Sequence, residues 1–153
     1  MLLEVGSPLP DITLPDQSDT PRKLSELLGA HGAVIYFYPK DNTPGCSLEA
    51  VDFEALQGAF AEKGLKIIGV SKDSVKSHSN FCQKKGLTFT LLSDQEGALC
   101  EAFGVWQEKK NYGRTYMGIV RSTFVVDGSG KVQTVYAKVK TKGHAQKVLD
   151  GLG

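Results

Sequence analysis

The sequence has few of the features that mark several large classes of protein. It contains three cysteines, Cys46, Cys82 and Cys100, and this odd, widely spaced set is not the disulfide framework of a small secreted protein. The net charge is +1, and the lysine pairs 84–85 and 109–110 are interpreted as solvated surface, so we expect no nucleic-acid partner. Because the sequence has no apolar run of membrane-span length and no basic, apolar leader at its start, we expect no membrane partner and no signal peptide.

The composition is that of a folded protein. Hydrophobic residues make up 41% of the 153 residues and charged residues 23%, which suits a globular chain with a core. The sequence has no internal repeat, low-complexity tract or linker. We therefore expect one domain over residues 1–153.

Hydrophobic periodicity predicts alternating strands and helices. A continuous apolar run at 33–38 and another at 65–70 predict buried strands on either side of a helix at 44–62, so these two strands should be parallel with a right-handed crossover. The other predicted elements are strands near 11–14, at 123–126 and at 131–136, and helices at 74–85, 98–103 and 142–151. This order predicts an α/β thioredoxin-like fold, in which a central mixed β-sheet is flanked by α-helices.

The helix at 44–62 is expected to present an apolar side made of small and aliphatic residues. Its helical spacing places four residues on that side, with Phe53 and Phe60 near the edges. The four residues are Leu48, Val51, Ala55 and Ala59.

The stretch YPKDNTPGCSLEA, residues 38–50, places a cysteine at the start of that helix. With Thr43 as N-cap and Pro44 at the first helical position, Cys46 is the third helical residue. Free amides and the positive end of the helix dipole favour an anion there, so the thiolate suits this position. The Thr43 hydroxyl is expected to cap those amides, and Gly45 to leave the approach to the sulfur open. The alternative is that Cys46 is a small buried residue of the core.

The segment PKDNTPGC, residues 39–46, resembles the Pro-x-x-x-Thr-x-x-Cys motif of the peroxiredoxins. The longer FYPKDNTPGCSLEA resembles their Q-type branch, also called the bacterioferritin comigratory protein branch. GIVRSTFVVD at 118–127 and VGSPLPDITLPDQ at 5–17 are similar to further segments of this family. The resemblance implies a thiol-dependent peroxidase that reduces hydrogen peroxide and alkyl hydroperoxides.

The resemblance also implies roles for individual residues. Cys46 would be the peroxidatic cysteine, and Thr43 and Arg121 would hold the thiolate and the peroxide. Pro39 would shield the site. Glu49 would orient the arginine, or it is simply an acidic residue favoured in the first turns of a helix. Taken alone, Arg121 would be interpreted as a surface cation beside a strand.

Attack on a peroxide leaves a cysteine sulfenic acid, which condenses with a second thiol. Many Q-type members carry that resolving cysteine five residues after the first, where this chain has Val51. A subset of the branch has it in the helix that corresponds to 74–85, which favours Cys82 over Cys100 or an external thiol. Cys100 is expected to fill the core. Because a disulfide requires Cα atoms within about 7 Å, one or both helix ends should unwind when it forms.

Other functions compete with this interpretation. A thiol–disulfide oxidoreductase is one, although the chain has no Cys-x-x-Cys motif, and a non-enzymatic binding or holdase module is another. His78 and Cys82 lie four residues apart on one helix, but no second ligand pair accompanies them, so we expect no metal and no cofactor. His31 and His144 are interpreted as ordinary loop or helix-start residues. The resemblance implies a thioredoxin or a similar dithiol as reductant, a monomer, and a cytoplasmic location.

Overall fold

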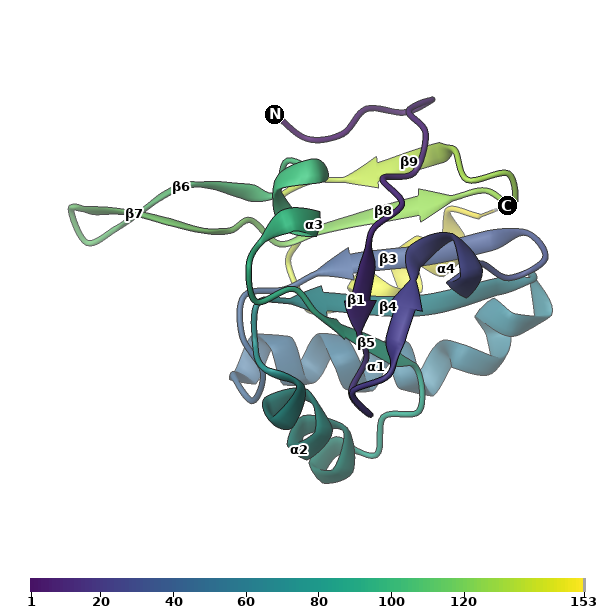
Figure 1. Ribbon diagram of the computed structural model, residues 1–153, viewed down its shortest axis with the longest axis horizontal. Helices are drawn as coiled ribbons and strands as arrows, with labels where there is room; N and C mark the ends of the chain where they lie inside the picture. Colours follow the sequence, from purple (N-terminus) through teal and green to yellow (C-terminus); the bar gives the residue numbers. More distant parts are fainter. Residues whose placement is uncertain (153) are drawn as a thin grey trace.

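A computed structural model of the protein describes residues 1–152, and its centre is a mixed five-stranded sheet (Figure 1). The strand order is β5-β4-β3-β8-β9. The strands are β3 (Gly32–Phe37), β4 (Leu65–Ser71), β5 (Thr90–Ser93), β8 (Ser122–Val126) and β9 (Val132–Tyr136). β3, β4 and β5 run parallel, whereas β8 is antiparallel to β3 and to β9. The predicted thioredoxin-like fold with a mixed sheet is confirmed.

Helices cover both faces of this sheet. They are α1 (Pro44–Glu62), α2 (Val75–Lys85), α3 (Ala98–Ala102), α4 (His144–Asp150) and the 3₁₀ helix η1 (Leu24–Leu27). Apolar residues of α1, α2 and α4 form one core cluster with the sheet, and residues of η1 and α3 form a second cluster. Cys46 and Cys82 belong to the first cluster and Cys100 to the second. Within residues 1–152, no helix combines the length and the apolar character that a membrane crossing requires.

Two small antiparallel pairs lie outside the central sheet. β1 (Thr13–Pro15) pairs with β2 (Pro21–Lys23), and β6 (Trp106–Asn111) pairs with β7 (Arg114–Ile119). The β6–β7 hairpin extends away from the body of the molecule (Figure 1). β7 ends at Ile119, where the hairpin returns to the body of the molecule, and Arg121 lies between β7 and β8. Neither this hairpin nor β2, β5 and η1 was predicted.

The apolar side predicted for α1 is wrong. Leu48 and Val51 are each 42% exposed, whereas the buried side of the helix contains Glu49, Ala50 and Phe53. Both sets have helical spacing, but only one faces the sheet, where the Phe53 ring stacks on Tyr36 with ring centroids 4.7 Å apart. The aromatic side chains bury more area than the aliphatic ones, which decides the rotation of the helix. As a result, Cys46 and Glu49 point inward together.

Candidate functional site

The helix α1 begins as the sequence predicts. Thr43 is the N-cap residue with an extended backbone, and Pro44 occupies the first helical position. The first backbone bond of the helix runs from the Ser47 amide to the Thr43 carbonyl, at 2.8 Å. The amides of Gly45 and Cys46 precede that bond and have no acceptor within the helix. The Cys46 side chain therefore lies in the positively polarised first turn, and it is 1% exposed.

The Thr43 hydroxyl does not cap the helix, contrary to the sequence-based prediction. It donates to the Lys40 carbonyl at 2.9 Å, and it accepts no hydrogen bond from the first turn. The intervening Asn42 has a φ of 61°, which curls the loop so that this carbonyl lies within reach. The hydroxyl proton is thus used within the loop, while the lone pairs of its oxygen can accept from a ligand.

Arg121 connects the two residues of α1 that carry the chemistry. Its Nη2 donates to Cys46 Sγ at 3.2 Å, and its Nη1 donates to Glu49 Oε1 at 2.7 Å. Cys46 and Glu49 lie three residues apart, so they share one side of the helix. One planar guanidinium spans both groups. The structure thereby brings together Cys46, Glu49 and Arg121, the three residues that the family resemblance implies.

Burial makes the charges of this trio depend on one another. Burial disfavours the Arg121 cation, but Glu49 and Cys46 outweigh it and raise the arginine pKa above its ordinary value. Burial raises the pKa of Glu49 to about 7, against the lowering effect of Arg121. Glu49 Oε2 and the Tyr36 hydroxyl have no hydrogen-bond partner within residues 1–152. The carboxyl group can therefore hold a proton on Oε2 while Oε1 accepts from the arginine.

Gly45 lies next to Cys46 and near two side chains from distant parts of the sequence, Thr141 and Arg121. A carbon placed at the Cβ position of Gly45 would lie 3.5 Å from Thr141 Cγ2 and 3.7 Å from Arg121 Nη2. The Arg121 guanidinium and Thr141 therefore border this side of the first turn of α1. Lys109 of β6 donates to the Ile119 carbonyl at 2.7 Å, and burial, followed by the charge of Arg121, lowers its pKa. The site thus has two further cationic or polar neighbours that the motif did not indicate.

The remaining predicted residues lie outside this trio, on other elements of the fold. Pro39 is exposed just after β3. Cys82 lies in α2, and burial, with the charges of Asp41 and Glu54, raises its pKa to about 11. Cys100 is fully buried in α3 on the other face of the sheet, where burial and Asp94 raise its pKa. All three cysteines are free thiols.

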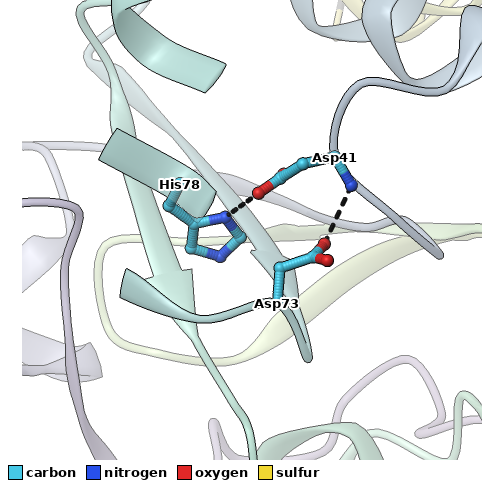
Figure 2. Close-up of side chains that lie close together, drawn as sticks. All are labelled: Asp41, Asp73 and His78. Carbon is cyan, nitrogen blue, oxygen red and sulfur yellow. Dashed lines mark hydrogen bonds and ion pairs between the residues drawn. The ribbon is translucent and has the colours of Figure 1, made fainter. Parts of the chain in front are cut away.

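A second group of polar side chains lies near the site, and the sequence did not reveal it as a group. Asp41, Asp73 and His78 place their ligand-type atoms within 4.8 Å of one another (Figure 2). Both carboxylates already accept hydrogen bonds, from Tyr38, Ser77 and His78 on Asp41 and from Ser71 and the Asp41 amide on Asp73. Hydrogen bonding therefore accounts for the group without a metal ion. The available signal was the parallel pairing of β3 and β4, because the loops that follow two parallel strands lie at the same edge of the sheet.

A cysteine at a helix start, held by a partly buried arginine on a thioredoxin-like fold, defines a thiol-based redox enzyme. The AhpC/TSA family matches residues 5–135. "Peroxiredoxin Bcp" of Bacillus subtilis is 47% identical over 152 residues, which cover 99% of this chain and 96% of that protein. The chain belongs to the AhpC/TSA family, in the Q-type or Bcp branch of the peroxiredoxins. It is a thiol peroxidase.

Solved structures of similar proteins agree with this membership. A structure of the Xanthomonas campestris bacterioferritin comigratory protein, described for its alkyl peroxide reduction activity, has a TM-score of 0.89 and 47% identity, covering 98% of this chain and 95% of that one. Two structures of X. campestris peroxiredoxin Q, each with a serine in place of one cysteine, have a TM-score of 0.89 and 48% identity. Each covers 98% of this chain, and 95% and 94% of the other chains. The two replaced cysteines have the same separation in sequence as Cys46 and Cys82.

Proposed function

We propose that Cys46 attacks the peroxide, that Cys82 resolves the product as an intramolecular disulfide, and that a thioredoxin-type dithiol reduces this disulfide. The observation that carries the proposal is the 3.2 Å contact between the Arg121 guanidinium and Cys46 Sγ at the start of α1. A fixed cation beside a sulfur stabilises the thiolate, which is the nucleophilic form. A cysteine that only filled the core would not require a cation beside its sulfur.

In the first step the Cys46 thiolate attacks one oxygen of the peroxide. The S–O bond forms as the O–O bond breaks, the sulfur is oxidised to a sulfenic acid, and the peroxide leaves as an alcohol, or as water from hydrogen peroxide, after taking a proton. Negative charge moves from sulfur to oxygen during this step. Arg121 and the free amides of Gly45 and Cys46 are donors that can stabilise that charge without reorganising.

Thr43 and Glu49 orient the reactants in this account. Because the Thr43 hydroxyl donates its hydrogen bond to the Lys40 carbonyl, its oxygen accepts from the O–H of the hydroperoxide and aligns the O–O bond. Glu49 holds the arginine through Nη1, which leaves Nη2 directed at the sulfur. Pro39, exposed at the end of β3, would limit access of water to the reacting groups.

In the second step the Cys82 sulfur attacks the sulfenic sulfur of Cys46. An S–S bond forms and the hydroxyl group leaves as water after protonation, so the oxidising equivalent of the peroxide is stored in the disulfide. Both cysteines belong to the same core cluster but lie on different helices. α1 packs on β4 and α4 while α2 packs on β5, so in this account the helix ends open to bring the two sulfurs within bonding distance.

Opening would also activate Cys82. In the closed structure burial raises its pKa to about 11, which keeps the thiol protonated near neutral pH. Release of the α2 segment into water removes that penalty and increases the thiolate fraction. The two X. campestris variants with serine at cysteines of the same separation support this choice of pair.

The proposed enzyme acts as one domain and as a monomer in the cytoplasm. Its substrates are hydrogen peroxide and alkyl hydroperoxides, and its reductant is a thioredoxin or a similar dithiol protein. The experiment that tests this function is a coupled assay with thioredoxin, its reductase and NADPH. Consumption of NADPH should require both a peroxide and Cys46, and an undiminished rate in Cys46→Ser would reject the assignment.

A further inference from the structure

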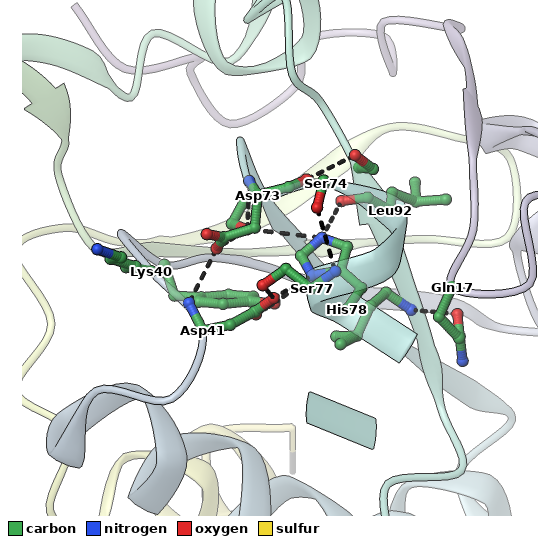
Figure 3. A network of polar contacts seen from close by, with 12 residues as sticks. Gln17, Lys40, Asp41, Asp73, Ser74, Ser77, His78 and Leu92 are labelled. Atoms are coloured by element: carbon green, nitrogen blue, oxygen red, sulfur yellow. Dashed lines mark hydrogen bonds and ion pairs between the residues drawn. The ribbon is translucent and has the colours of Figure 1, made fainter. Parts of the chain in front are cut away.

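The loop before the reactive helix and the helix that carries Cys82 are joined by a buried polar network (Figure 3). Asp41 of the loop is 4% exposed, and its Oδ2 accepts from His78 Nδ1 at 2.7 Å and from Ser77 Oγ at 2.8 Å. The Asp41 amide donates to Asp73 Oδ2 at 2.8 Å. Three hydrogen bonds thus cross from one loop residue to the start of α2. No other residue of the loop 39–43 is buried in this way.

His78 is fully buried in this network, and both of its ring nitrogens face oxygen atoms. Its Nδ1 faces the Asp41 carboxylate and its Nε2 faces the Leu92 carbonyl at 3.0 Å. A carboxylate and a carbonyl oxygen only accept, so both short contacts are hydrogen bonds when each ring nitrogen carries a proton. The side chain is fully buried, so with both ring nitrogens protonated it forms a desolvated ion pair with Asp41. The same contact, among others, lowers the pKa of Asp41 despite the opposing effect of burial.

We propose that the Asp41–His78 ion pair is a latch between the Cys46 loop and α2, and that its breaking limits the rate at which Cys82 reaches oxidised Cys46. The proposal rests on the assignment of Cys82 as the resolving residue. Asp41 and His78 are then positioning residues for the disulfide-forming step. They hold the closed arrangement in which Arg121 contacts Cys46, and they release it for the second step.

The position of the latch relative to both cysteines supports this role. His78 precedes Cys82 by one helical turn, so the two side chains lie on the same side of α2. Asp41 lies five residues before Cys46, and the segment between them contains Thr43 and Pro44. Unwinding α2 from its start pulls His78 away from Asp41. Opening of the first turn of α1 pulls Asp41 away from His78.

The charges determine the direction of the effect. In the closed state, removal of the His78 charge leaves the Asp41 carboxylate buried without its counter-ion, which is strongly unfavourable. In the open state water hydrates that carboxylate, so the same substitution costs little. A neutral residue at 78 therefore shifts the balance toward the open state. Faster disulfide formation is the consequence, together with less over-oxidation of Cys46, because resolution competes with further attack by peroxide.

The test measures the two steps separately in His78→Gln. The protein is mixed with one equivalent of hydrogen peroxide, quenched with acid at set times, and analysed by mass spectrometry for sulfenic acid and for linked peptides. We expect the disulfide to form at least about tenfold faster, because removing one partner of a buried ion pair strongly destabilises the closed state. We expect the rate of sulfenic acid formation to change by less than about threefold, since the Arg121–Cys46 contact is retained.

Three further variants keep the test specific. Ser77→Ala removes one hydrogen bond from Asp41 but leaves the ion pair, so it should give a smaller acceleration in a protein that folds readily. Asp41→Asn should accelerate the disulfide step in the wild-type background and have little further effect in His78→Gln, because partners in one contact are not additive. Asp94→Asn is the matched control, since this buried carboxylate binds the amides of Leu99 and Cys100 rather than α2. It should leave the disulfide step unchanged.

The outcomes separate the latch from the proposed function. If the wild type forms no Cys46–Cys82 bond, the assignment of the resolving cysteine is wrong and the latch falls with it. If the wild type forms that bond but His78→Gln and Ser77→Ala form it at the wild-type rate or more slowly, the latch alone is overturned. Equal acceleration in Asp94→Asn would also overturn it, because the effect would then follow general stability.

Discussion

Arg121 donates to Cys46 Sγ across 3.2 Å, although 75 residues separate them in sequence. The contact depends on β8 pairing with β3, because α1 follows β3 directly and Arg121 precedes β8. Antiparallel pairing of these strands brings the end of one next to the beginning of the other. The central sheet therefore places Arg121 beside Cys46.

Arg121→Ala should slow the reaction of Cys46 with hydrogen peroxide by about 100-fold, because one preorganised donor contributes roughly 3 kcal/mol. Arg121→Lys should recover only part of the rate, since an ammonium group cannot contact Cys46 and Glu49 with a fixed planar geometry. Stopped-flow measurement of sulfenic acid formation gives both rates. A loss smaller than tenfold in Arg121→Ala, in a protein with wild-type circular dichroism, would remove the arginine from the mechanism.

Glu49 should make the stability of the protein depend on pH in an unusual direction. Its folded pKa is raised to about 7, so the folded state retains the proton that the unfolded state loses at lower pH. The stabilisation is complete below the unfolded pKa and is lost as the pH rises through about 7. The free energy of unfolding of the wild type, relative to Glu49→Gln, should therefore decrease between about pH 5 and pH 8. Urea denaturation at both pH values measures it, and an unchanged difference would contradict the raised pKa.

Thr43→Val should slow peroxide reduction with little effect on helix stability. The hydroxyl makes no capping bond to α1, so its loss removes no helix cap. It does remove the hydrogen bond to Lys40 and the acceptor for the peroxide O–H, and Thr43→Ser should restore both. We expect Thr43→Val to lose about tenfold or more in rate, at about the cost of one hydrogen bond to a reacting group. Equal rates for the Val and Ser variants would rule out a role for the hydroxyl.

Cys82→Ser should react once with peroxide and then stall. Its sulfenic acid has no partner thiol in reach, so excess peroxide should convert it to the sulfinic acid more readily than in the wild type. Cys100→Ala is the matched control, because this cysteine is buried on the opposite face of the sheet. Turnover with thioredoxin should be nearly lost in the first variant and nearly wild type in the second. The opposite pattern would identify Cys100 as the resolving residue.

The start of α1 could be predicted from the sequence because its signals are local. Thr43, Pro44 and Cys46 follow one another, and proline has a strong preference for the first helical position. The parallel pairing of the two strands that flank the helix followed from their strand–helix–strand order. The trio with Arg121 was identified only through the family resemblance, since no local pattern marks a lone arginine as catalytic.

The buried side of α1 and the hydrogen bonds of the loop before it could not be predicted from local sequence signals. Two stripes of α1 have helical spacing, and only contact with Tyr36 decides between them. The Thr43 hydroxyl donates to the Lys40 carbonyl because Asn42 has a positive φ, and the composition of the loop does not reveal this conformation. Asp41 and His78 meet through the edge of the sheet, 37 residues apart, and their pairing depends on side-chain directions in three dimensions.

The central claim is that peroxide converts Cys46 and Cys82 into one intramolecular disulfide. The direct measurement is peptide mapping by mass spectrometry after the reduced protein reacts with one equivalent of hydrogen peroxide. We expect a single linked pair, Cys46 with Cys82, that thioredoxin reduces, and no such product in Cys46→Ser. A Cys46–Cys100 bond, a bond between two chains, or a sulfenic acid that persists at Cys46 with Cys82 still free would contradict it.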